Sequence, residues 1–66
     1  MSRLLGLQLA AGDPRAIRSV ERAMRAANGS VRAAAAALGV HEGSLSRWLR
    51  LPQLAKAAAL RQGRAI

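Results

Sequence analysis

The chain has no cysteine, which excludes disulfide bonds and thiolate metal sites. Its only histidine is His41, so a cluster of histidine ligands is excluded as well, and its carboxylates are limited to Asp13, Glu21 and Glu42. With so few acids, bases and nucleophiles, we expect no enzyme, no metal or cofactor site and no small-molecule ligand. Phe and Tyr are also absent. A core of Leu and Ala with the single Trp48 is thin for 66 residues, because so short a chain buries little surface.

Long apolar runs are missing too. The longest, Ala33 to Leu38, falls far short of the roughly 20 residues that a membrane span requires. The first seven residues faintly resemble a signal peptide, but Gly6 and Gln8 interrupt the apolar stretch and it carries a single Arg. The sequence therefore predicts a cytoplasmic, nucleoid-associated protein without a membrane partner.

What the chain has in excess is positive charge. Ten Arg and one Lys stand against three carboxylates, which gives a net charge of +8 and a pI near 12.0. Such a balance indicates a polyanionic partner, with nucleic acid as the first choice and an anionic membrane as the second.

Gly, Pro and Asn punctuate the chain and divide it into an N-terminal arm (1–12), a helical domain (13–62) and a tail (63–66). Helices are predicted over residues 14–27, 31–38, 42–50 and 53–62. The fold class predicted from this pattern is all-α, a small domain of three to four helices. The arm is ambiguous: Leu5, Leu7 and Leu9 alternate as in a strand, Leu4, Leu5 and Leu9 suit a helix, and Gly6 argues against a helix. Its leucines favour packing across a dimer interface.

The predicted helix 14–27 has the clearest pattern. Asp13 can cap it, and Pro14 suits its first position because the missing N–H has no partner there. Two opposite faces follow from the helical period, one apolar and one basic. The apolar stripe comprises Ala16, Ile17, Val20, Ala23, Met24 and Ala27, and the arginine stripe comprises Arg15, Arg18, Arg22 and Arg25. The arginine stripe is open to two interpretations, a solvated face or a phosphate-contacting flank.

The next two predicted helices have the spacing of a helix-turn-helix with its turn at 39–41. This unit requires a small residue facing the second helix, a Gly four residues later, an apolar residue after the turn and two apolar residues that lock the second helix. Those positions are Ala35, Gly39, Val40, Leu45 and Trp48. Trp48 has an alternative role in base stacking, but its spacing from Leu45 favours the core.

Residues 20–50 resemble the helix-turn-helix of the Fis (factor for inversion stimulation) type, which also ends bacterial enhancer-binding proteins of the nitrogen-regulation class. The resemblance lies in Glu21-Arg22, Asn28-Gly29-Ser30, Ala34-Ala35, Leu38-Gly39-Val40, Ser44-Leu45 and Trp48-Leu49-Arg50. It implies a homodimer with the recognition helix, about 42–50, in the major groove of double-stranded DNA. It further implies DNA contacts from Ser30, Arg32, His41, Glu42, Ser44, Ser46, Arg47 and Arg50.

Each of these side chains has a chemical role available in that setting. One of Arg47 and Arg50 can contact a guanine and the other a phosphate. Ser30 and Ser44 suit phosphates because they lie at helix starts. Glu42 stands where a basic residue is usual in the family and can accept from a cytosine amino group instead. The alternative for each residue is a solvated surface group.

The favoured function is sequence-specific DNA binding by a small dimeric bacterial or phage transcriptional regulator. An architectural, nucleoid-type DNA binder would differ in having little sequence preference. A third hypothesis is a membrane-active cationic helix. The turn and cap residues argue against it, because they predict a compact domain of several helices. An adaptor resembling the small subunits of phage terminases, which carry a similar module, would differ in forming an assembly larger than a dimer.

Overall fold

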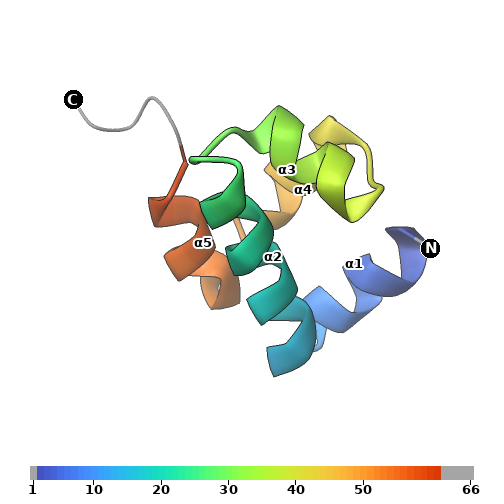
Figure 1. The fold of residues 1–66 in the computed structure, drawn as a ribbon. Helices are drawn as coiled ribbons and strands as arrows, with labels where there is room; N and C mark the ends of the chain where they lie inside the picture. The colour runs from blue at the N-terminus through green and yellow to red at the C-terminus, as the bar shows by residue number, and fades with distance from the viewer. Residues whose placement is uncertain (1, 62–66) are drawn as a thin grey trace.

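The structure is a computed structural model that describes residues 2–61, and those residues are all-helical, with no strand among them (Figure 1). The α-helices are α1 (Ser2–Ala10), α2 (Pro14–Ala26), α3 (Val31–Leu38), α4 (Glu42–Trp48) and α5 (Ala55–Ala59), with one 3-10 helix, η1 (Pro52–Leu54). The predicted all-α class is confirmed for this part of the chain. The tail expected at 63–66 lies outside the described residues.

Helix α2 begins and packs as its sequence predicts. The Asp13 carboxylate accepts a 2.9 Å hydrogen bond from the Arg15 N–H and caps the helix. Ala16, Val20 and Met24 are buried along one face, and Ile17 packs partly buried beside them. The helix ends at Ala26. Asn28 and Gly29 follow with positive φ, and the Gly29 N–H donates to the Met24 carbonyl.

Helix α3 supplies little bulk, which lets its neighbours approach closely. The Ser30 hydroxyl accepts a 3.2 Å hydrogen bond from the Ala33 N–H and caps the helix. Of its five alanines, Ala34 and Ala35 are buried, and α3 packs against both α2 and α4. The helix has the predicted bounds.

The N-terminal segment is a helix and belongs to the same core. Leu9 of α1 is fully buried, and the Gln53 side chain donates to the Leu9 carbonyl at 2.8 Å. Gly6 lies within this helix and faces the Trp48 indole. A Cβ atom at position 6 would lie 3.1 Å from the indole ring, so this close packing favours glycine. Through Leu9, helix α1 therefore shares a core with the helices that follow it.

The predicted bounds of the last two helices are wrong. Helix α4 ends at Trp48 instead of Arg50, because the next N–H groups of Arg50 and Leu51 bond three residues back. Leu51 is extended before Pro52. The helix expected over 53–62 is described only as far as residue 61, and this part forms η1 followed by the short α5.

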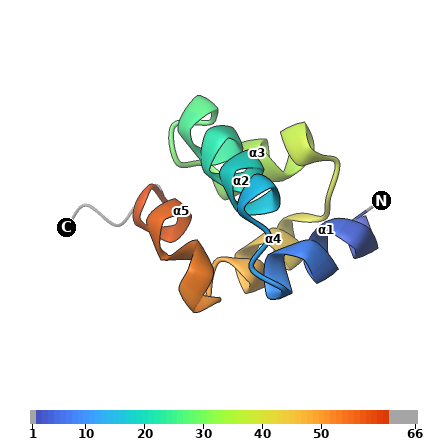
Figure 2. The same cartoon turned by 90° about the horizontal axis from the view of Figure 1, so that it is seen from below.

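The core lies between α2 on one side and α4 with α1 on the other (Figure 2). Its largest fully buried side chains are Leu9, Val20, Met24, Leu45 and Leu54. Trp48, expected to be the largest core residue, is only half-buried and packs against this cluster from its edge. The buried core is thus aliphatic, and Trp48 belongs to it only in part.

Candidate functional site

The turn between α3 and α4 is built by the residues that the spacing analysis selected. Gly39 has φ +72°, a left-handed conformation that favours glycine. The Val40 N–H donates to the Ala35 carbonyl at 2.9 Å, which closes the end of α3. Leu45, fully buried, then holds α4 against the core. Local hydrogen bonds and burial together fix the angle between the two helices.

Helix α4 directs one face away from the core. Arg47 is two residues from both Leu45 and Leu49, which are buried, so at 3.6 residues per turn it points outward. Arg50 follows on the same side and is also exposed. The two exposed arginines, one on α4 and one just after it, are called the outward ridge below.

The two serines of α4 lie differently. Ser44 and Ser46 are both half-buried on the flanks of the ridge, whereas Glu42 is exposed on the first turn. Any contact made through the ridge would therefore meet Arg47 and Arg50 first, with the serines as lateral groups.

His41 has a structural role that limits its freedom. Its Nδ1 accepts a 3.0 Å hydrogen bond from the Gly43 N–H and caps α4. The ring must therefore carry its proton on Nε2 to serve as this acceptor. Only the Nε2 edge is left for a partner, so His41 is primarily the cap that Ser or Asn usually provides.

Ser30 and Arg32 lie at the start of α3, on a different element from the ridge. The Ser30 hydroxyl is engaged as the α3 cap, and Arg32, the second residue of the helix, is exposed. No hydrogen bond joins either residue to α4 within the described part of the chain. The predicted site is therefore a surface formed by two helix starts and one outward ridge, and it is not an enclosed pocket.

Gly43 belongs to the same exposed surface, although the predicted contact residues do not include it. It is four residues before Arg47, hence on the same outward ridge. The absence of a side chain there leaves the backbone of the first turn open to a close partner. A Cβ at this position would lie 3.2 Å from His41 Nδ1, which also explains why a small residue suits the cap. The i, i+4 spacing from Arg47 was the available signal.

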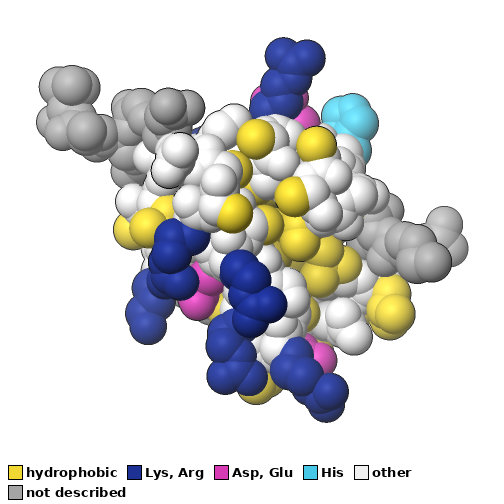
Figure 3. All heavy atoms as spheres, viewed as in Figure 1, with side chains coloured by type: hydrophobic (Ala, Val, Ile, Leu, Met, Phe, Trp, Pro, Cys, Tyr) yellow, Lys and Arg dark blue, Asp and Glu magenta, His cyan; other side chains and the backbone are white. Residues whose placement is uncertain are grey.

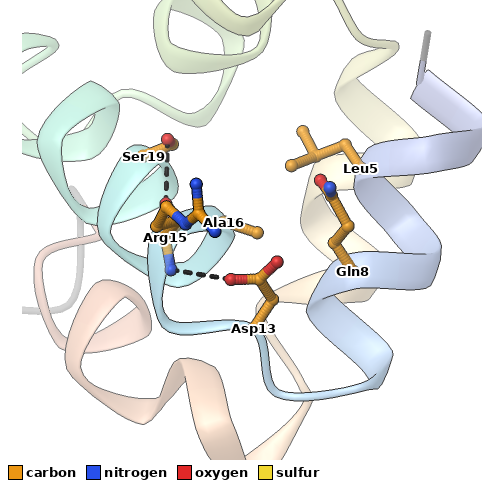
Figure 4. Close-up of a pocket in the computed structure, with 6 residues that line it drawn as sticks. All are labelled: Leu5, Gln8, Asp13, Arg15, Ala16 and Ser19. Carbon is orange, nitrogen blue, oxygen red and sulfur yellow. Dashed lines mark hydrogen bonds between the residues drawn. The ribbon is translucent and has the colours of Figure 1, made fainter.

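A cavity of about 250 Å³ lies between α1 and α2 (Figure 4). It is lined by Leu5, Gln8, Asp13, Arg15, Ala16 and Ser19. Two of its polar groups are already used, since Asp13 caps α2 and the Ser19 hydroxyl donates to the Arg15 carbonyl. Among residues 2–61, no group of three or more His, Asp or Glu side chains gathers to hold a metal ion.

Comparison with known proteins adds no assignment: the chain matches no family model, no curated protein and no solved structure. No helix within the described range has the length and apolar character needed to cross a bilayer.

Proposed function

We propose that the chain binds double-stranded DNA with sequence preference, as a small dimeric regulator of bacterial or phage transcription associated with the nucleoid. In this proposal α3, the turn and α4 act as a helix-turn-helix, and α4 enters the major groove. The observation that carries the proposal is the outward ridge of Gly43, Arg47 and Arg50 on a helix locked by Leu45 and Leu49. The resemblance of residues 20–50 to the Fis-type module supports it.

The side chains of the ridge have distinct tasks. An arginine can donate two parallel hydrogen bonds to O6 and N7 of guanine, the commonest specific contact in the major groove. Arg47, at the centre of the ridge, is assigned this contact, and Arg50, two residues past the end of α4, is assigned a phosphate. The missing side chain of Gly43 allows the helix start to approach the DNA.

The remaining predicted residues hold the orientation of the module. Arg32 and the cap at Ser30 face the DNA backbone at the start of α3, a contact that fixes register without reading sequence. Glu42, exposed on the first turn of α4, can accept from a cytosine amino group. His41 contributes through its Nε2–H, since its Nδ1 caps the helix.

The test is selection of duplexes from a randomised pool at near-physiological salt, with the bound fraction sequenced. An enriched inverted repeat with half-sites about one helical turn apart would support a dimeric, specific regulator. Retention without enrichment would favour the architectural binder instead. No retention would refute DNA binding and leave the adaptor reading, to be examined by the assembly state.

A matched pair of variants locates the contact. Arg47→Ala should lower affinity for the selected site by about 1–3 kcal/mol and relax its preference at one base pair, whereas Arg18→Ala should at most weaken all sequences equally. Both variants remove one exposed arginine. Equal losses across all sequences for both would overturn the assignment of α4 to the groove.

A further inference from the structure

The arginine stripe of α2 is a second strongly basic surface that the proposed DNA site does not use. Arg15, Arg18, Arg22 and Arg25 are all exposed. Arg18 is two residues from buried Ala16 and Val20, and Arg22 is two residues from buried Val20 and Met24, so these guanidinium groups point away from the core. Lys and Arg side chains gather over this helix in the space-filling view (Figure 3).

This surface and the ridge of α4 face opposite ways. Helices α2 and α4 lie on opposite sides of the core, as Figure 2 shows. Each turns its buried residues inward, Val20 and Met24 from α2 and Leu45 and Leu49 from α4. The arginines two positions from these residues therefore project from opposite faces of the molecule.

A single straight duplex cannot satisfy both faces. The Cα atoms span 17 Å even along the shortest axis of the molecule. That thickness exceeds the screening length of about 8 Å at physiological salt, so DNA held on the α4 ridge gains little from the α2 stripe. A polyanionic partner of the α2 stripe is therefore a different molecule from the duplex held on the α4 ridge.

We propose that the α2 arginine stripe binds the backbone of a second DNA duplex, so that one molecule bridges two DNA segments. This inference rests on the proposed function, because α4 holds the first duplex. From residue 15 to residue 25 the helix rises about 15 Å, and a duplex presents roughly nine phosphate charges over that length. The contact requires no sequence recognition, since the stripe offers only charge to phosphates.

Charge and burial favour DNA over a membrane as the occupant. A helix that lies on a bilayer inserts its apolar face, but the apolar face of α2 is already buried in the core at Val20 and Met24. The stripe therefore has only electrostatic attraction to offer. A duplex, with its regular line of phosphates, matches a row of arginines along a rigid helix.

Capture of a second duplex tests the proposal. The full chain is added to beads carrying an unlabelled duplex that contains the selected site, then to a fluorescent duplex of unrelated sequence, and the fluorescence retained is measured. The test variant is Arg18→Gln with Arg22→Gln. The control removes the same charge elsewhere, through Lys56→Gln with Arg61→Gln. Circular dichroism verifies that both variants fold.

We expect the wild type and the control variant to capture the second duplex. The α2 variant should retain about tenfold less of the fluorescent duplex while still binding the bead-bound site. Equal capture by the two variants would overturn the proposal. In a parallel assay, phosphatidylglycerol vesicles are offered together with the second duplex, and preferential capture of the vesicles would also overturn it. A wild type that binds the first duplex and captures no second one refutes bridging alone. A wild type that binds no duplex refutes the proposed function itself. A dimer that bridges through its two α4 helices would retain capture in the α2 variant.

Discussion

A Cβ atom on Gly6 would lie 3.1 Å from Cζ2 of Trp48, closer than a side chain normally approaches. Gly6 is in the middle of α1 and Trp48 is the last residue of α4. The contact lets the indole lie against the α1 backbone and so joins the N-terminal helix to the helix that carries Arg47. Gly destabilises a helix interior relative to Ala, and this packing offsets that cost.

Enlarging Gly6 should separate the two helices. We expect Gly6→Leu to lower the free energy of unfolding by about 1–3 kcal/mol, as overpacked sites do. The control is Ala10→Leu, an exposed position on the same helix, which should change stability little. Urea unfolding followed by the emission of the single tryptophan measures both. A Gly6→Leu variant as stable as the wild type would show that Trp48 does not hold α1.

Gly39 should be sensitive through its backbone alone. A Cβ there would meet nothing within 4 Å, but the φ of +72° penalises any other residue. Gly39→Ala should cost about 1–2 kcal/mol of stability, and Gly39→Asn less, since Asn tolerates this conformation. Thermal unfolding by circular dichroism gives the order. A loss for Asn as large as for Ala would point to a cause other than φ.

The hydrogen bonds from the Gln53 side chain to the end of α1 should contribute to the stability of the fold. Its Nε2 donates to the Leu9 carbonyl at 2.8 Å and to the Ala10 carbonyl at 3.3 Å. Gln53→Leu removes both bonds while the Leu9 carbonyl keeps its bond from the Gly12 N–H, so the loss should be about 0.5–1.5 kcal/mol. Lys56→Leu, at an exposed position of α5, is the control. Equal stability of the two variants in urea would contradict the role given to Gln53.

The proposed dimer can be tested on the surface of α1. Leu4 and Leu7 are 60% and 64% exposed and lie on the side of the helix away from Leu9. If this face forms the interface, Leu4→Gln with Leu7→Gln should shift the sedimentation mass from dimer to monomer, because apolar contact area is lost. Deletion of residues 2–11 is a poorer test, since it also removes Leu9 from the core. A dimer that survives the double substitution would assign the interface elsewhere.

Binding should weaken steeply with salt if the partner is DNA. About six phosphate contacts would give a slope near −5 for log affinity against log salt concentration. The α2 variant Arg18→Gln with Arg22→Gln should leave the slope for a single duplex unchanged, because those arginines face away from it. A flat response of the wild type would exclude nucleic acid as the partner.

Features that depend on neighbours in sequence were predictable. The caps at Asp13 and Ser30, the left-handed Gly39 and the extended Leu51 before Pro52 are determined by residue types within a few positions. The two faces of α2 follow from the helical period, since one apolar stripe must be buried. The outward placement of Arg47 is predictable in the same way from its spacing to Leu45.

The tertiary structure decided what depends on distant contacts. Alternating leucines left the segment before residue 12 between strand and helix, and packing against Trp48, Gln53 and the core made it α1. Tertiary packing also left Trp48 half-buried, although its spacing from Leu45 favoured the core. Periodicity places the arginines of α2 and α4 on the outer face of each helix, but it carries no information about how the helices are oriented to one another. Only the packing of both helices on a common core set those two basic faces on opposite sides of the molecule.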